Sequence, residues 1–284
     1  MGIKTVGIVS PGDMGGTVGR VLIEHGLRVI ACLEDRSERT RNLATQAGIE
    51  AVDSFHTLVE QADIILSILV PAQAKEAAQQ IASIVAKSHA DTIYVDCNAI
   101  APQTTREINQ IITEAGGTFI DASIIGPPPH KPGDTRFYTS GPRAEIFAEL
   151  NEFGLDVRVL GAEIGQASAI KMCYAALTKG LTALASELLI ASEALNVSQP
   201  LAAEFEMSQP QLYQRLARQV PRVPAKSRRF VGEMEEIAAT FESVGLTPNI
   251  LTGAADMYRF IGSTPFADRA PEDESSIPKL EDFL

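Results

Sequence analysis

Short apolar runs alternate with amphipathic segments through the first half of the chain. Runs of strand length lie at residues 4–10, 27–33, 62–69, 91–97 and 118–125. Segments with helical spacing follow the first four of these runs, at residues 13–25, 37–48, 72–87 and 102–117. Two further strand-like runs, 135–141 and 156–161, flank a helical segment at 143–154. The strands are apolar on both faces, as in a parallel sheet covered by helices on both sides. The pattern therefore predicts an α/β fold with a doubly wound sheet.

The pattern changes near Gly165. Residues 165–195 contain no proline, are rich in alanine and leucine, and are apolar around most of a helix. A helix of that length spans roughly 45 Å. Further helical segments follow at 200–220, 227–245 and 247–263. We therefore expect an α/β domain at residues 1–162 and an all-helical domain at residues 163–266, which begins with a long interdomain helix.

The helical domain is expected to pair with a second copy of the chain. Alanine on all faces of its long helix favours close helix packing, so we predict a homodimer through this domain. Residues 267–284 are acidic and contain proline, which predicts an extended or mobile tail. Such a tail is either solvated or laid over a partner subunit.

Composition narrows the class of protein. The chain has 284 residues, of which 45% are hydrophobic, enough for a sizeable core. No apolar run is long enough to span a bilayer, and the amino terminus lacks the layout of a signal peptide, so we expect a cytoplasmic protein without membrane contact. A net charge of −12 argues against nucleic-acid binding. The cysteines Cys32, Cys97 and Cys173 are interpreted as buried reduced thiols, and we expect no metal site.

The first strand-like run leads into a degenerate dinucleotide-binding turn. The fingerprint G-x-G-x-x-G is here Ser10-Pro11-Gly12-Asp13-Met14-Gly15, with serine at the first glycine. Gly12 still permits the backbone to approach a pyrophosphate, and Gly15 still permits close packing of helix on strand. Ser10-Pro11 supplies a turn by another route. The alternative is a purely structural turn, but a place between the first strand and the first helix favours a nucleotide site.

The end of the second strand bears on the choice of cofactor. Glu34 or Asp35 would bind a ribose diol, as in NAD sites, whereas Arg36 and Ser37 would bind a 2′-phosphate. The Arg-Ser pair at the turn favours NADP(H) over NAD(H). The alternative is that these residues are solvated charges on the first turn of a helix.

Five segments, in order, resemble the β-hydroxyacid dehydrogenase and 6-phosphogluconate dehydrogenase superfamily. GIVSPGDMG is similar to its amino-terminal turn, and SILVPAQA to a loop that lies along the cofactor. VDCNAIAPQT resembles the stretch near the nicotinamide, FIDASIIGPP resembles the substrate stretch, and GQASAIKMCYAA matches the interdomain helix with its catalytic lysine. The carboxy-terminal part, with VPRVPAKSRRFVGEMEEIAAT, resembles a branch whose helical domain is of unknown function. The resemblance implies a Rossmann-type first domain.

The resemblance also implies roles for particular residues. Lys171 would be the catalytic acid/base. The serine of the family's substrate stretch corresponds to Ile125, whereas a serine stands two residues earlier here, as Ser123. Ser123 and Gly126 are expected to contact the substrate because they lie at a strand end, where open α/β sheets bind ligands. The sequence departs from the family at Ala175, where the family has asparagine, and near Glu233, where it has a lysine that binds a substrate carboxylate. We therefore expect a substrate that differs from a simple β-hydroxy acid.

Each candidate has a structural alternative. A lysine in apolar surroundings loses its proton more readily, as a general base must, but Lys171 could instead extend to the domain edge. Ser123 is either a substrate contact or a buried serine bonded to backbone, and Asn98 either a nicotinamide contact or a helix cap. We interpret His130, in a proline-rich loop, as exposed.

The resulting prediction is an NADP-dependent oxidoreductase that moves hydride between the nicotinamide and a carbon bearing a hydroxyl or oxo group of a small molecule. An imine (C=N) reductase on the same fold is the alternative, and a non-catalytic nucleotide-bound sensor or scaffold is the third hypothesis. The catalytic residues expected are Lys171 and Ser123, and Ser123 and Gly126 are expected to bind substrate. The cofactor-binding residues expected are Ser10, Pro11, Gly12, Asp13, Met14, Gly15, Arg36, Ser37, Val70 and Asn98.

Overall fold

The computed structural model describes residues 2–88, 91–269, 277 and 280. The chain divides into two compact units, residues 1–172 and 173–284, and the division falls inside the long helix α7 (Gln166–Ala194). The expected boundary after residue 162 lies in the connection that leads into this helix. Most of the expected acidic tail lies outside the described residues, from residue 270 on.

The first unit is built on an eight-stranded sheet with the order β3-β2-β1-β4-β5-β6-β7-β8. Its strands are β1 (Thr5–Ile8), β2 (Arg28–Cys32), β3 (Glu50–Val52), β4 (Ile64–Ser67), β5 (Ile93–Asp96), β6 (Thr118–Ile125), β7 (Arg136–Ser140) and β8 (Val157–Gly161). Within this described sheet β6 and β7 pair antiparallel, and the other neighbours pair parallel. The predicted Rossmann-type doubly wound sheet is confirmed.

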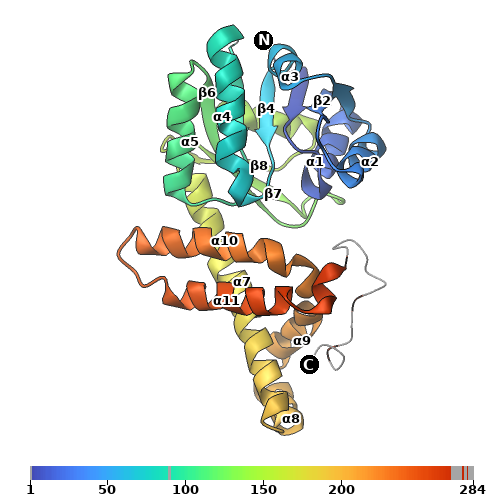
Figure 1. Ribbon diagram of the computed structural model, residues 1–284, viewed down its shortest axis with the longest axis vertical. Coiled ribbons are helices and arrows are strands. Elements are labelled where there is room, and N and C mark those ends of the chain that lie inside the picture. Colours follow the sequence, from blue (N-terminus) through green and yellow to red (C-terminus); the bar gives the residue numbers. More distant parts are fainter. Residues whose placement is uncertain (1, 89–90, 270–276, 278–279, 281–284) are drawn as a thin grey trace. The chain divides into compact units, whose positions relative to one another are not determined.

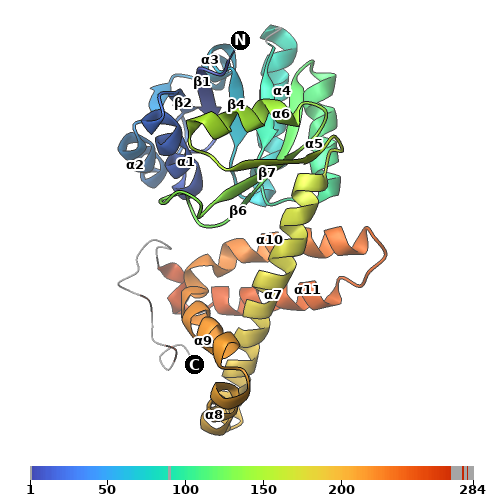
Figure 2. The same ribbon diagram turned by 180° about the vertical axis from the view of Figure 1, so that it is seen from behind.

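Helices cover both faces of the sheet. They are α1 (Asp13–Glu24), α2 (Glu38–Ala47), α3 (Phe55–Gln61), α4 (Pro71–Ser88), α5 (Pro102–Glu114) and α6 (Ala144–Ala148), which a 3-10 turn, η1 (Glu149–Phe153), extends. Buried side chains of α1, α2 and α6 form one core with the sheet, and those of α3, α4 and α5 form another. Figure 1 shows α4 and α5 in front of the sheet, and Figure 2, from behind, shows α6 on the opposite face. The sheet is therefore buried between two helical layers, as its apolar strands require.

Two elements of this unit have no counterpart in the predicted pattern. Strand β3 has three residues at the sheet edge, and the side chains of Glu50 and Ala51 are exposed. Helix α3 has seven residues, of which Leu58 and Val59 are buried. Both are too short for a hydrophobic period to stand out.

Polar side chains lie next to one another at the carboxyl ends of the central strands. Ser67 on β4 pairs with Asp96 on β5, and Asp96 pairs with Asp121 on β6. The carboxyl ends of parallel strands meet at one edge, which is where open α/β sheets bind ligands. This edge is the place to look for a site.

The second unit is helical throughout its described part. After α7 it contains α8 (Ser198–Ser208), α9 (Pro210–Gln219), α10 (Pro224–Glu242) and α11 (Asn249–Gly262), with short 3-10 turns at Val220–Arg222 and Pro265–Asp268. Helices α10 and α11 lie side by side in Figures 1 and 2, and the rings of Phe230 and Tyr258 pack edge to face with centroids 5.2 Å apart.

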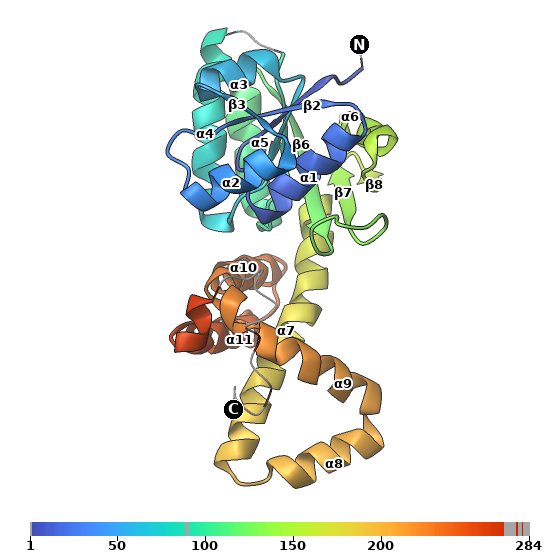
Figure 3. The same cartoon turned by 90° about the vertical axis from the view of Figure 1, so that its right-hand side faces the viewer.

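The segment at 200–220, read from the sequence as one helical stretch, is two helices. Figure 3 shows the chain turning sharply between α8 and α9. Gln209 leaves the helical conformation, with φ −140° and ψ 47°. The cause is Pro210, because a proline ring disfavours the helical conformation at the residue before it.

One described segment, α7, is long and apolar enough to cross a bilayer by length and composition alone. Its 29 residues contain a window of mean hydropathy 1.2, of which 33% is buried. The expectation that no segment reaches this length is therefore wrong. Lysines within the helix interrupt its apolar run, but the mean hydropathy of the window stays high enough for a membrane span. Core helices of soluble proteins pass the same test.

Candidate functional site

The turn between β1 and α1 has the shape that a dinucleotide site requires. The Gly12 amide donates to Ser10 O at 2.9 Å, which closes the turn without the first glycine of the fingerprint. A Cβ built on Gly12 would meet no described atom within 4 Å outside the adjoining backbone. A Cβ on Gly15 would lie 2.5 Å from Ser10 O and 3.3 Å from Ile8 Cγ2. Gly12 thus leaves the backbone open to a ligand, and Gly15 lets α1 pack against β1.

The end of β2 forms one wall of a pocket of about 290 Å³. Glu34, Asp35 and Glu76 place carboxylates in its lining, together with Arg36. Arg36 Nη2 lies 3.5 Å from Val9 O, and its Nε is buried without a hydrogen-bond partner among the described residues. Ser37 Oγ accepts a hydrogen bond from Thr40 N at 3.2 Å, so this hydroxyl caps α2. The pocket therefore presents groups suited to either form of the cofactor.

Asn98 is held in a buried network at the ends of β4 and β5. Its Nδ2 donates to Ser67 Oγ at 3.0 Å and to Asp96 Oδ2 at 3.1 Å, and its backbone N donates to Asp96 Oδ1 at 2.9 Å. Its Oδ1 accepts from Leu69 N at 2.5 Å. Asn98 thus fixes the start of the loop in which Val70, 42% exposed, lies. Its role as a direct cofactor contact stays a prediction.

Asp96 at the centre of that network is a weak acid. Burial raises the pKa of this carboxyl to about 7, against the lowering effect of the hydrogen bonds from Asn98. The charge of the neighbouring Asp121 adds a smaller upward effect.

The carboxyl end of β6 carries the predicted substrate residues. Ser123 is fully buried, and its Oγ has no hydrogen-bond partner in the part of the chain that the structure describes. Gly126 follows the strand with φ +131°, and a Cβ there would lie 2.2 Å from Asp134 O. Only glycine fits at this position, because its φ is strained for other residues and the carbonyl leaves no room.

Lys171 reaches the same strand from α7. Its Nζ donates to Ile124 O at 2.6 Å, and the contact is partly buried. Ile124 follows Ser123 directly in β6. The structure therefore brings the predicted acid/base to the residue next to the predicted substrate serine.

Asp121 is a residue that the sequence analysis did not single out. It is fully buried on β6, and its carboxylate accepts hydrogen bonds from the first turn of α7 and from neighbouring hydroxyls. Burial raises the pKa of this carboxyl, and the bonds from Ser168, Ser140 and Gly165 oppose the rise. A charged aspartate inside a mostly apolar strand, in FIDASII, is the signal that would have found it.

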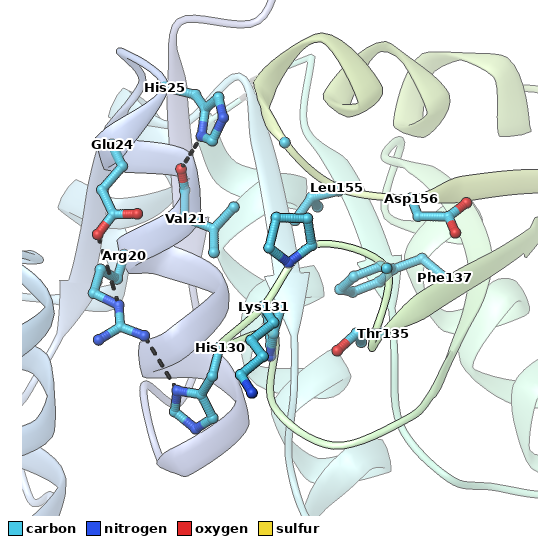
Figure 4. A pocket seen from close by; sticks show the side chains of 14 residues that line it. Arg20, Val21, Glu24, His25, His130, Lys131, Thr135, Phe137, Leu155 and Asp156 are labelled. Carbon is cyan, nitrogen blue, oxygen red and sulfur yellow. Dashed lines mark hydrogen bonds and ion pairs between the residues drawn. The ribbon is translucent and has the colours of Figure 1, made fainter.

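A second pocket, of about 630 Å³, lies between α1 and the loop from β6 to β7 (Figure 4). Arg20 stands between Glu24 and His130, and its Nη2 lies 3.2 Å from His130 Nδ1. His130 is exposed, as predicted. Basic Arg20 and Lys131 are balanced by acidic Glu24 and Asp156 in the lining, so the pocket does not select one sign of charge.

The second unit holds the positions where the sequence departs from the family. Glu233 is buried on α10 and binds Lys179 of α7, and Arg229 lies 3.2 Å from its other oxygen. Tyr258 OH donates to Lys179 O at 2.7 Å. Ala175 is also buried. Among the described residues, no group of three or more histidine, cysteine or acidic side chains is arranged to hold a metal ion.

Comparison with known proteins places this architecture in a family. Residues 5–153 match the NAD binding domain of 6-phosphogluconate dehydrogenase, and residues 192–261 match a domain of unknown function (DUF1932). The mitochondrial 3-hydroxyisobutyrate dehydrogenase of Bos taurus is 28% identical over 179 residues, which cover 61% of this chain and 52% of that protein.

Solved structures agree with this assignment. A conserved protein of unknown function, whose structure resembles 3-hydroxyacid dehydrogenases, is 30% identical, with a TM-score of 0.68 over 92% of this chain and 100% of that chain. The imine reductase of Myxococcus stipitatus, solved with NADP+, shares the fold at 20% identity, with a TM-score of 0.57 over 90% of this chain and 92% of its own. The chain belongs to the family that carries the NAD binding domain of 6-phosphogluconate dehydrogenase.

Proposed function

We propose that the protein is an NADP-dependent oxidoreductase that moves hydride between the nicotinamide and a carbon bearing a hydroxyl or oxo group. Lys171 acts as the general acid/base. The observation that carries the proposal is the contact of Lys171 Nζ with Ile124 O at 2.6 Å, at the residue that follows Ser123, whose buried Oγ has no hydrogen-bond partner among the described residues. A proton donor and an unpartnered hydroxyl at one strand end are what a reacting hydroxyl or carbonyl needs.

The residues present fit a dinucleotide. The open side of Gly12 and the first amides of α1 would hold the pyrophosphate, because a helix amino terminus favours an anion and glycine lets it approach. Arg36 and Ser37 would hold a 2′-phosphate, while the loop with Val70 would lie along the cofactor and Asn98 would lie near the nicotinamide. The cofactor, when bound, supplies or accepts the hydride.

Lys171 handles the proton. A lysine ammonium has three N–H donors, and the bond to Ile124 O fixes the direction of the side chain. The ammonium donates a proton to the reacting oxygen as hydride arrives, and the amine accepts one in the reverse direction. Ser123 Oγ orients that oxygen by hydrogen bonding.

A second candidate is reduction of a C=N bond. It is favoured by Glu233, which stands where the family has a carboxylate-binding lysine and is bound by Lys179 and Arg229. Glu233 is paired with both cations, so this residue supplies no positive charge to a substrate carboxylate, which suits a substrate without an acid group.

We also propose that the protein is a cytoplasmic homodimer. On α7, Tyr174, Leu177 and Leu184 lie on one face and are 50%, 71% and 56% exposed. An apolar stripe of this kind favours a second copy as its cover.

The test is to measure turnover of a panel of hydroxy acids, oxo acids and cyclic imines through the change in absorbance of the nicotinamide cofactor. On any substrate found, Lys171→Met should lower kcat by roughly 10²- to 10⁴-fold, as loss of a general acid/base does. Its affinity for the cofactor should stay within about twofold, because the pyrophosphate site is at the other end of the cofactor.

Lys87→Met is the matched control, because Lys87 is exposed in the last turn of α4. Near-normal turnover by Lys171→Met would make the lysine structural and would move the imine-reductase and sensor readings ahead.

A further inference from the structure

Asp121 fastens the start of α7 to the sheet. Its Oδ2 accepts hydrogen bonds from the backbone N of Gly165 (2.8 Å), Ala167 (3.1 Å) and Ser168 (3.2 Å). The same oxygen accepts from Ser140 Oγ at 2.8 Å, and Oδ1 accepts from Ser168 Oγ at 2.7 Å. These amides are the ones that a helix amino terminus leaves without partners, so a carboxylate distant in sequence caps α7.

The same strand and the same helix meet a second time at Lys171. Ser168 and Lys171 are three residues apart on α7 and therefore share a helix face. Asp121 and Ile124 are three residues apart on β6, and they are the partners of Ser168 and Lys171, respectively. Helix α7 is thus attached to β6 at its first turn and again through the ammonium of Lys171.

We propose that Asp121 is a positioning residue that sets where the ammonium of Lys171 lies. By binding the first amides of α7, the carboxylate fixes both the height and the rotation of the helix relative to β6. That in turn places Lys171 Nζ at Ile124 O. The inference rests on the proposed function for its effect on turnover, but its geometric part concerns Lys171 alone.

A carboxylate suits this task better than any neutral side chain. It has two acceptor oxygens and no donor, whereas the groups around Asp121 are five donors. In Asp121→Asn one oxygen becomes an NH₂ group that faces donors. The bond network is lost in part while the volume of the side chain is kept.

The second contact of the network gives a graded variant. Ser168 Oγ bonds Asp121 Oδ1 and lies 2.7 Å from Thr105 Oγ1. Ser168→Ala removes this one hydroxyl and leaves the backbone bonds to Asp121 in place. Its effect on Lys171 should have the same sign as that of Asp121→Asn and be smaller.

The matched control is Asp63, another carboxylate that binds backbone. Its Oδ2 accepts from Lys4 N and Thr5 N at 2.8 Å each, at the start of β1. Asp63→Asn removes bonds of the same kind from the same unit without touching α7 or β6.

The first readout needs no substrate. In the full-length chain, acetylation of Lys171 by acetic anhydride is followed by mass spectrometry, with Lys87 as internal reference. The hydrogen bond to Ile124 O restrains the amine of Lys171, and its loss in Asp121→Asn lets the side chain meet the reagent more freely. The relative rate at Lys171 should therefore rise by about five- to tenfold. Ser168→Ala should raise the rate by about twofold, and Asp63→Asn should leave it at the parent value.

The second readout is turnover on any substrate found. Asp121→Asn should lower kcat by about 10- to 100-fold, as displacement of a catalytic group by about 1 Å does, with cofactor Kd within about twofold. The pH profile of kcat should also shift, which simple loss of folded protein would not produce.

An unchanged acetylation rate at Lys171 in folded Asp121→Asn would overturn the proposal, as would an equal rise in Asp63→Asn. If Asp121→Asn does not fold, Ser168→Ala decides the matter alone, and a parent-like rate there overturns the proposal. If Lys171→Met keeps its turnover while acetylation responds as expected, the proposed function fails and the positioning stands.

Discussion

Three alanine substitutions in one turn separate cofactor binding from stability. Gly12, Gly15 and Gly16 lie within one turn of each other at the start of α1, yet the space beside each differs. A Cβ on Gly12 would meet no described atom within 4 Å beyond the adjoining chain, whereas a Cβ on Gly15 would lie 2.5 Å from Ser10 O. A Cβ on Gly16 would lie at ordinary contact, 3.5 Å from Pro11 O. The same methyl group is therefore tested in open space, in a clash and in normal packing.

The magnitudes follow from these distances. Gly16→Ala should raise the free energy of unfolding by up to about 1 kcal/mol, because alanine favours a helix over glycine. Gly15→Ala gains the same term but adds about 1–3 kcal/mol of overpacking, so it should be less stable than Gly16→Ala by that amount. Gly12→Ala lies at the helix cap and should change stability by less than about 1 kcal/mol.

Binding should follow a different order. If a pyrophosphate approaches over Gly12, the new methyl group fills that approach, and NADPH affinity in Gly12→Ala should fall by about tenfold or more, equivalent to the loss of about 1.4 kcal/mol. Gly16→Ala should bind as the parent does. Urea unfolding followed by circular dichroism gives the stabilities, and titration of NADPH fluorescence gives the affinities. Parent-like NADPH binding by Gly12→Ala would refute the reasoning, because no dinucleotide could then lie against that face.

Three further predictions follow from other parts of the molecule. NADPH should bind more tightly than NADH, and Arg36→Ala should erase the difference; tighter NADH binding by the parent would instead point to Glu34 and Asp35 in the same pocket. Burial raises the pKa of Asp96 to about 7, so the folded protein holds the proton of this carboxyl more tightly than the unfolded chain does. Its contribution to the free energy of unfolding is therefore complete at pH values below the usual aspartate pKa, and it is lost as pH rises through about 7. Between about pH 4 and about pH 8, urea unfolding should show that the free energy of unfolding of the parent falls by up to about 4 kcal/mol relative to that of Asp96→Asn. Parallel plots of this free energy against pH for the two proteins would contradict the prediction. Light scattering at micromolar concentration should report twice the chain mass of 30.4 kDa, and Leu177→Glu, which changes a side chain 71% exposed, should yield the monomer; a monomeric parent would sink the dimer.

The fold could be predicted because its central strands are mostly apolar and its longer helices show a clear hydrophobic period. Strand β3 and helix α3 were not predicted, because a short edge strand with an exposed glutamate and a seven-residue helix show little hydrophobic periodicity. The break between α8 and α9 is different. Pro210 was visible in the sequence, but a proline is also tolerated at the first turn of a helix, and it takes that position in α9.

The candidate site could be predicted at residues whose chemistry is local. The meeting of Lys171 with β6 follows from the family motifs, and the structure adds the acceptor, Ile124 O, which no side-chain pattern reveals. The network around Asn98 was beyond the sequence, because it joins Ser67, Asp96 and Leu69, which come from different strands and loops. Long-range hydrogen bonds of this kind depend on strand order and register.

The two adjacent carboxyl groups, Asp96 and Asp121, differ in how well their surroundings stabilise a negative charge. They are register partners on β5 and β6, and the charge of Asp121 contributes to the raised pKa of Asp96. Asp121 faces five donors and a helix amino terminus, whereas the bonds that lower the pKa of Asp96 come from one residue, Asn98. The negative charge is therefore best held on Asp121, beside α7, and the proton on Asp96, beside the loop that contains Val70. Loss of the carboxylate charge should therefore matter more at Asp121 than at Asp96. Asp121→Asn should displace the side chain of Lys171, whereas Asp96→Asn should leave it in place.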